Sequence, residues 1–226
     1  MHIAVLGTGV VGRTLAEAFA ARGHDLVVGT RDVAATLGRT EPDGMGTPPY
    51  AEWADANPDI PLVPLADAGS HGEVLVNATN GGGSLEALRG AGDLDGTVVL
   101  DVSNPLDFSQ GYPPTLSVAN SDSLAEQLQR ALPRARVVKS LNTMTAAVMV
   151  DPALVPGEHH VFVAGEDAAA KAVVTELLGE LGWPAERVLD LGGLRAARAA
   201  EMYLPMWLTL MGVTGSPLFN IQVNRG

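Results

Sequence analysis

The sequence predicts an α/β fold: a doubly wound parallel β-sheet with a small C-terminal α/β lobe packed against it. Two observations indicate this class. Short β-branched runs alternate with stretches rich in Ala and Leu along most of the 226 residues, as in repeated strand–helix–strand units. A glycine-rich turn, GTGVVG, also joins the first predicted strand to the first predicted helix at residues 7–12.

The first 145 residues contain six predicted strands, at 2–7, 25–30, 61–66, 73–79, 97–103 and 135–142. Helices are expected at 10–23, 51–58 and 123–132, with a loop and a further helix after residue 80. The prolines of the third strand indicate an edge position, because proline cannot donate to the ladder. Six strands with crossovers are the number in a complete dinucleotide-binding fold. We therefore expect one domain over 1–145 and a smaller C-terminal part over 146–226.

The C-terminal part is predicted to hold strands at 159–165 and 186–192, a helix at 167–182, and a long final helix at 194–212 that is kinked at Pro205. Arg198 and Glu201 have the spacing of a pair on one helix face. An apolar set on the same helix is expected to pack in the core or in a dimer interface: Met202, Leu204, Met206, Trp207 and Met211.

Composition narrows the function. The net charge of -12 argues against a nucleic-acid partner, which would require clustered Lys and Arg. With no cysteine in the chain, thiolate catalysis and Cys-based metal sites are excluded. His159 and His160 are adjacent in a strand and point to opposite faces, so no metal site is expected. Neither a targeting signal nor a run long enough to span a membrane is evident, and we expect a cytoplasmic protein.

The turn at 7–12 fits the pattern G-x-G-x-x-G in the context that gives it meaning, between a strand and a helix. Its first glycine permits a tight turn, the second lets backbone approach a pyrophosphate, and the third allows close packing of helix and strand. Backbone N–H groups at the helix start would hold the phosphates. This predicts a Rossmann-type fold with a cofactor-binding turn made of Gly7, Thr8, Gly9, Val10, Val11 and Gly12.

The end of the second strand, VVGTRD, indicates which dinucleotide is bound. A ribose-binding acid would lie roughly 20 residues beyond the turn, and Thr30 stands 18 residues after Gly12. Arg31 offers a planar cation suited to a 2′-phosphate, and Arg39 could add a second. Asp32 could instead reach the ribose and favour NAD, although it is well placed to cap the following helical turn. We predict NADP in preference to NAD.

Polar residues follow three later strands, and ligands bind at the carboxyl ends of such sheets. The expected cofactor or substrate contacts are Asn77, Ala78, Thr79, Asn80, Ser103, Asn104, Pro105, Asn142 and Thr143. Lys139 and Asn142 lie on opposite sides of one strand, so they are not expected to act together. No catalytic acid or base is identified, which agrees with hydride transfer between bound heterocycles, where the cofactors supply the chemistry.

Three segments of the chain resemble the coenzyme F-420-dependent NADP oxidoreductases, and the resemblance is to a bacterial-type member of that family. They are VLGTGVVGRTLAEAFAARGHDLVVGTRD; DVSNPL followed by SLAEQLQRALPRARVVKSLNTM; and VFVAGEDAAAKAVVTELLGELGW with VLDLGGLRAARAAE. The resemblance implies NADP on the Rossmann part, a deazaflavin in a cleft closed by the C-terminal part, hydride transfer between them, and usually a homodimer. It also implies that Thr8, Thr30 and Arg31 hold NADP, with Arg31 on the 2′-phosphate.

The leading prediction is an NADP(H)-dependent oxidoreductase that exchanges hydride with coenzyme F-420. Two alternatives remain open from the sequence. One is an NADPH reductase of a flavin, a quinone or a small imine or carbonyl compound. The other is a non-catalytic NADP-binding regulatory protein, with which the lack of a clear acid or base also agrees.

Overall fold

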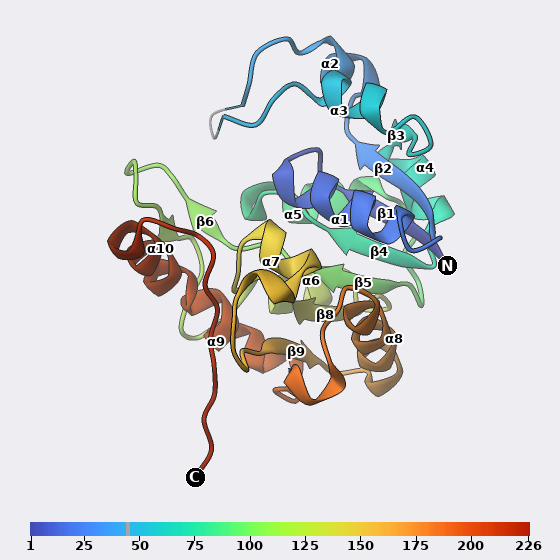
Figure 1. Ribbon diagram of the computed structural model, residues 1–226. Coiled ribbons are helices and arrows are strands. Elements are labelled where there is room, and N and C mark those ends of the chain that lie inside the picture. Colours follow the sequence, from blue (N-terminus) through green and yellow to red (C-terminus); the bar gives the residue numbers. More distant parts are fainter. Residues whose placement is uncertain (44–45) are drawn as a thin grey trace.

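An eight-stranded β-sheet, in the order β10-β9-β8-β5-β4-β1-β2-β3, forms the centre of the computed structural model, which describes residues 1–43 and 46–226 (Figure 1). Its strands are β1 (His2–Leu6), β2 (Asp25–Thr30), β3 (Leu62–Pro64), β4 (Val74–Asn77), β5 (Val98–Asp101), β8 (Arg136–Ser140), β9 (Val161–Gly165) and β10 (Val188–Asp190). A separate hairpin consists of β6 (Leu106–Asp107) and β7 (Thr115–Leu116). The predicted edge position of the third strand is confirmed, since β3 ends the sheet.

Six strands, β3, β2, β1, β4, β5 and β8, are parallel, as the sequence predicts. The strands of the C-terminal part extend the same sheet in the opposite direction. β9 pairs antiparallel with β8, and β10 pairs parallel with β9. The fold is thus a mostly parallel, Rossmann-type α/β sheet, while a division of the chain at residue 145 remains a prediction.

Helices cover both faces of the sheet, because alternate strand residues point to opposite sides. Ile3 and Val5 of β1 belong to one apolar cluster, and Ala4 and Leu6 to the other. The first cluster packs under α1 (Val10–Ala20), α3 (Tyr50–Ala56), α7 (Ala146–Val150) and α8 (Ala168–Glu180). The second packs under α4 (Leu65–His71), α5 (Gly81–Gly90), α6 (Leu124–Ala131) and α9 (Ala197–Met202). The remaining helices are α2 (Val33–Gly38), α10 (Leu204–Thr214), and the short 3-10 turns η1 (Pro152–Leu154), η2 (Ala185–Arg187) and η3 (Leu194–Ala196).

The prediction of one continuous final helix over 194–212 is wrong. The chain forms η3, α9 and α10 in succession, with a break at Tyr203. Pro205 lies in the first turn of α10, where N–H groups have no acceptor within the helix. The lack of an N–H on proline therefore costs no hydrogen bond there. The proline therefore begins a new helix instead of kinking an existing one.

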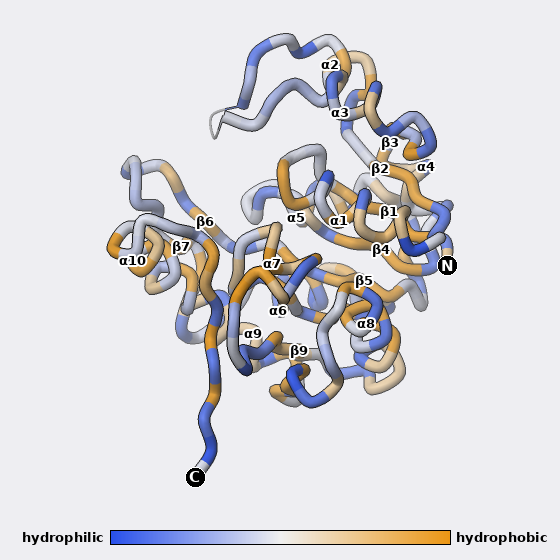
Figure 2. Tube along the Cα trace, viewed as in Figure 1, coloured by the Kyte–Doolittle hydropathy of each residue, from blue (hydrophilic) through white to orange (hydrophobic). Residues whose placement is uncertain are grey.

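Helix α10 is apolar around its circumference, yet Leu204 is its only buried residue. Figure 2 shows this apolar helix at the periphery, in contrast to the apolar strands at the centre. Val213 and Met206 are 80% and 56% exposed. Helices that are apolar all round are normally covered in proteins. Within the described residues, no helix combines the length and apolar character needed to cross a membrane.

Candidate functional site

The carboxyl ends of β1, β2, β4 and β5 meet at one edge of the sheet, on the side away from the N-terminus (Figure 1). The strand order reverses between β1 and β4. From β1 the chain moves outward through β2 to β3, and then it returns to β4 and continues through β5 to β8. In open parallel sheets, ligands bind in the crevice at such a reversal.

The glycine-rich turn lies at this reversal, and its three glycines differ in what surrounds them. Gly7 has φ of +124°, and a Cβ there would lie 2.4 Å from the carbonyl oxygen of Ala78. A Cβ at Gly12 would lie 2.1 Å from the carbonyl oxygen of Gly7. Apart from its two chain neighbours, no residue in 1–43 or 46–226 has an atom within 4 Å of the Cβ position at Gly9. The protein itself thus requires glycine at positions 7 and 12, whereas the space beside Gly9 is open.

A pocket of about 300 Å³ opens beside this turn. No acidic residue is among its lining residues, which are Gly7, Thr8, Gly9, Gly29, Thr30, Arg31, Leu65, Ala78, Thr79, Asn80, Gly83 and Ala87. Six of the predicted cofactor contacts therefore line this pocket together with Gly7 and Gly9 of the turn. Leu65 and Ala87, which sequence reasoning missed, supply apolar walls of the kind that a flat base packs against; no motif marks them.

The polar end of the pocket is formed by the residues that follow β2. Arg31 is exposed and forms no ion pair or hydrogen bond within residues 1–43 and 46–226. Asp32 is turned away to cap α2, where its carboxylate accepts from the Ala35 N–H at 2.9 Å, and this confirms the predicted cap. The hydroxyls of Thr30 and Thr36 lie 2.8 Å apart, and Thr36 donates to the Asp32 carbonyl. Among the described residues that line the pocket, Arg31 thus carries the only charged side chain.

Beneath the pocket, Asn77 is fully buried and does not reach the cavity. Its amide donates to Asp101 Oδ1 at 2.9 Å, and its carbonyl oxygen accepts from the Thr79 hydroxyl at 2.7 Å. Asn80 caps α5 by accepting from the Gly82 N–H at 3.1 Å. Asn77 therefore fixes the position of Thr79, which does line the pocket.

A second pocket of about 150 Å³ shares Ala78, Thr79 and Asn80 with the first, so the two adjoin along the strand ends, and together they are called the groove below. Its other lining residues are Val11, Gly81, Val102, Ser103, Asn104 and Leu106. The predicted contacts Ser103, Asn104 and Val11 thus come together at the end of this groove.

Asn142 acts behind the second pocket. Its Nδ2 donates to Asn104 Oδ1, and Asn104 Nδ2 donates to the Asn142 carbonyl, both at 2.9 Å. Asn142, Thr143 and Pro105 are buried outside both pockets. The preceding Leu141 has φ of +62°, a strained conformation for a bulky residue. Asn142 therefore holds Asn104 in place from this tight bend.

A buried charge cluster lies below Ser103. Lys139 Nζ is 2.9 Å from Asp101 Oδ2 and 3.0 Å from Glu201 Oε1, and it also donates to the Ser103 carbonyl. Burial alone would lower the pKa of Lys139, but the two carboxylates more than offset this and raise it. With its ammonium group enclosed, Lys139 reaches neither pocket, and it shares no contact with Asn142.

The predicted pairing of Arg198 with Glu201 is wrong. Arg198 forms a two-point ion pair with Glu126, with both N–O distances at 2.7 Å. Glu201 instead points inward and accepts from the N–H groups of Leu124 and Ala125 at the start of α6, besides binding Lys139. Tertiary partners on α6 and β8 thus replace the local helical pairing.

Arg13 is a site residue that sequence reasoning missed. It is 7% exposed, and its Nε donates to the Thr8 carbonyl of the glycine-rich turn at 2.8 Å. Its guanidinium carbon lies 5.2 Å from the centre of the Tyr50 ring, and burial lowers its pKa. The signal in the sequence is an arginine directly after the last glycine of the turn, where a helix core residue would stand.

This arrangement defines a class of protein. A mostly parallel sheet and a glycine-rich turn at the start of α1, beside a pocket at the strand reversal, are the features of a dinucleotide-binding fold. An arginine in place of the ribose-binding acid is the NADP form of this pattern. A family model for NADP oxidoreductases dependent on coenzyme F-420 matches residues 2–105. A crystal structure of a candidate F-420-dependent NADP-reductase from Arthrobacter sp. FB24 is 50% identical, covers 100% of both chains and has a TM-score of 0.93. The chain belongs to this family and is an NADP-dependent oxidoreductase.

More distant proteins share parts of this likeness. A hypothetical protein from Sinorhizobium meliloti is 25% identical, with 99% of this chain and 96% of that one covered at a TM-score of 0.70. The rat metalloreductase STEAP3 is 28% identical over 210 residues, which is 91% of this chain but 37% of the length of that protein. A reductive aminase from Aspergillus terreus, at 18% identity, shares the fold, with 94% of this chain and 62% of that one covered and a TM-score of 0.61.

Proposed function

We propose that the protein transfers hydride between NADP(H), bound in the groove along the strand ends, and the deazaflavin coenzyme F-420. The observation that carries the NADP part is the unpaired Arg31 guanidinium on a pocket wall that has no acidic side chain. A ribose 2′-phosphate would supply the missing counter-charge. Support for the deazaflavin comes from the family and from its similar member in Arthrobacter.

The residues present fit a dinucleotide along the whole groove. The free space beside Gly9 and the N–H groups at the start of α1 would accept the pyrophosphate. Leu65 and Ala87 would flank the adenine, while Thr30 and Arg31 would hold the 2′-phosphate. Asn80, Ser103 and Asn104 would position the nicotinamide end in the second pocket. Asn77 and Asn142 are assigned to positioning, because they contact other site residues and line neither pocket.

NADPH would supply the hydride, and the chain's own residues would orient its nicotinamide ring. No carboxylate, histidine or lysine of the described residues lines the second pocket. The site therefore depends on position and on exclusion of water rather than on proton transfer from a side chain. The acceptor would stack beside Ser103 and Leu106, against the C-terminal half of the chain.

The test combines cofactor binding with an acceptor screen. Arg31→Ala is expected to weaken NADPH binding about 10- to 100-fold, the effect of losing a charge-assisted contact worth about 1.5–3 kcal/mol, and to leave NADH binding nearly unchanged. Arg89→Ala, an exposed arginine on α5, is the matched control. Equal losses for both cofactors would contradict the 2′-phosphate assignment.

Turnover is then measured with the wild-type protein and NADPH. Bleaching of the visible deazaflavin band is expected with coenzyme F-420, and slower or no turnover with flavin, quinone or imine acceptors. Faster turnover with one of those acceptors would identify that compound, and not the deazaflavin, as the hydride acceptor. Tight NADPH binding without turnover on any acceptor would favour the regulatory alternative instead.

We further propose that the protein is cytoplasmic and that its chain divides into a cofactor part over 1–145 and a substrate part over 146–226. We also propose a homodimer in which a second copy of the chain covers α10. The support is the all-round apolar character of α10 and the exposure of Met206 and Val213. Light scattering of the intact protein is expected to give twice the chain mass, and Met206→Glu with Val213→Glu to give the monomer. A wild-type monomer at micromolar concentration would contradict this assignment.

A further inference from the structure

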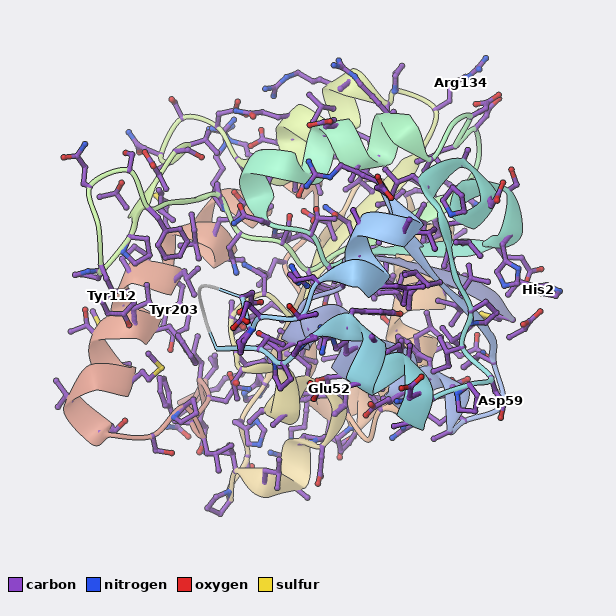
Figure 3. All side chains as sticks on the ribbon, turned by 90° about the horizontal axis from the view of Figure 1, so that it is seen from above. His2, Glu52, Asp59, Tyr112, Arg134 and Tyr203 are labelled. Carbon is purple, nitrogen blue, oxygen red and sulfur yellow. The ribbon has the colours of Figure 1, made fainter. Side chains whose placement is uncertain are left out.

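A cluster of metal-ligating side chains lies at the edge of the sheet opposite to the cofactor groove. It consists of His2, Asp25 and His71, whose ligand atoms all lie within 4.8 Å of one another. In Figure 3, His2 stands at the far end of the molecule from Tyr112, which belongs to the loop of the β6–β7 hairpin. His2 and Asp25 begin β1 and β2, whereas the groove lies at the carboxyl ends of these strands, so the cluster is separate from the proposed hydride-transfer site. Its role does not depend on the proposed function.

The fold fixes this cluster through three elements. His2 and Asp25 are register partners at the starts of the parallel strands β1 and β2, so their side chains leave the same face of the sheet. His71 comes from the last turn of α4, which packs on that face, and its ring meets the ring of His2 edge-on at 5.2 Å. No sequence motif predicts the site, because the three residues are far apart in the sequence and meet only in the folded chain.

The distances suit a tetrahedral ion. Asp25 Oδ2 lies 2.8 Å from His2 Nδ1 and 3.9 Å from His71 Nε2. Ligand bonds of about 2.0–2.2 Å to zinc place neighbouring donor atoms about 3.3–3.5 Å apart in a tetrahedron, a value between these two distances. The side chains of His2 and Asp25 are 57% and 61% exposed, so small rotations would bring all three donors into place.

Few competing contacts have to be broken. The side chains of His2 and Asp25 bond to each other, and His71 Nε2 otherwise meets only the Asp25 carbonyl at 3.2 Å. Two imidazole nitrogens and one carboxylate oxygen form a ligand set that zinc takes readily, with a water molecule completing the tetrahedron. We propose that His2, Asp25 and His71 form a zinc site that ties β1, β2 and α4 together at the amino-terminal edge of the sheet.

The site is tested by titrating the tag-free full-length protein with Zn²⁺ in a calorimeter and by recording the visible spectrum with Co²⁺. One ion per chain and the intense absorption of tetrahedral cobalt are expected. Since a metal that binds only the folded chain stabilises it, Zn²⁺ should also raise Tm. Binding weaker than millimolar, or an octahedral cobalt spectrum, would overturn the proposal.

Variants separate this site from nonspecific binding to surface histidines. His71→Ala and Asp25→Asn are each expected to weaken Zn²⁺ binding at least tenfold and to abolish the rise in Tm. The control is His24→Gln, a neighbouring histidine outside the cluster whose ring contacts Glu180 and the Met1 amino group, and it should bind zinc as the wild type does. Circular dichroism checks that each variant is folded. Undiminished binding in His71→Ala and Asp25→Asn would assign the ion elsewhere.

Discussion

Glu201 of α9 and Lys139 of β8 meet at 3.0 Å in the interior, where the side chains are 1% and 0% exposed. Through Lys139 the contact continues to Asp101 and the Ser103 carbonyl, at the wall of the second pocket. The carboxylate of Glu201 also caps α6. The side chain of Glu201 thus supports both helix α6 and, through Lys139, the wall of the second pocket.

Glu201→Gln is expected to destabilise the fold by about 1–3 kcal/mol, the cost of leaving buried N–H donors without their acceptor, because Lys139 keeps Asp101 as its ion-pair partner. Urea unfolding measures this loss. The control is Glu158→Gln, which breaks the exposed pair with Arg187 and should change the free energy of unfolding by about 0–1 kcal/mol. Similar losses in the two variants would contradict the importance of the buried cluster.

The same cluster predicts a loss of stability in alkali. The raised pKa of Lys139 means that the folded state holds this proton more tightly than the unfolded chain. The stabilisation is complete below the ordinary lysine pKa of about 10.4 and is lost as the pH rises through the folded value. Urea midpoints between pH 9 and pH 12 are expected to fall more steeply for the wild type than for Glu201→Gln.

Arg13→Gln is expected to weaken NADPH and NADH binding equally, by about tenfold, or about 1.4 kcal/mol. The reason is that Arg13 holds the Thr8 carbonyl of the turn beside the pyrophosphate, a group that both cofactors share. Fluorescence titration with each cofactor measures the effect. A loss confined to NADPH would show that Arg13, like Arg31, acts on the 2′-phosphate.

Gly9→Ala and Gly12→Ala form a matched pair that separates binding from folding. Gly9 has φ of -80° and open space at its Cβ position, so the alanine variant should fold with unchanged Tm and lose most NADPH affinity. At Gly12 the Cβ would overlap the Gly7 carbonyl, so that variant should lose stability itself. Normal NADPH binding by Gly9→Ala would show that the pyrophosphate does not bind beside this turn.

Asp122 provides a prediction in acid. Its hydrogen bonds to Arg130 lower its pKa from 3.8 to about 2, although burial opposes this. Its stabilising effect is therefore present above the ordinary value and is lost as the pH falls through about 2. Carboxyl NMR should find this midpoint in the wild type and a higher one, near 3.8, in Arg130→Gln. An unchanged midpoint would mean that the pair does not persist in solution.

The cofactor half of the fold was predictable because its signals are local. Strand–helix alternation located the strands to within a few residues, and the proline content of 61–66 placed β3 at an edge. The spacing of the turn identified the residues beside the first pocket. The acid at position 32 was correctly interpreted as a cap, because N-caps depend on residues three positions away.

The remaining features depend on contacts that are distant in sequence. Nothing in VFVAG reveals that β9 runs antiparallel to β8, since strand direction follows from the route of the connecting chain. Asn77 and Asn142 look like ligand contacts by position, yet neighbouring strands and loops turn them inward. Glu201 finds Lys139 instead of Arg198 because a buried ammonium attracts a carboxylate more strongly than a surface guanidinium.

The reversed strand β9 also sets the order in which the molecule is completed during synthesis. Both β9 and β10 end at the amino-terminal edge of the sheet, so the last helices must return across it to reach the start of α6. Asp101 and Lys139 leave the ribosome well before Glu201. Until α9 emerges, Lys139 has only Asp101 of its two carboxylate partners, and α6 lacks its carboxylate cap. The appearance of α9 is therefore the step at which the cofactor half acquires its final support.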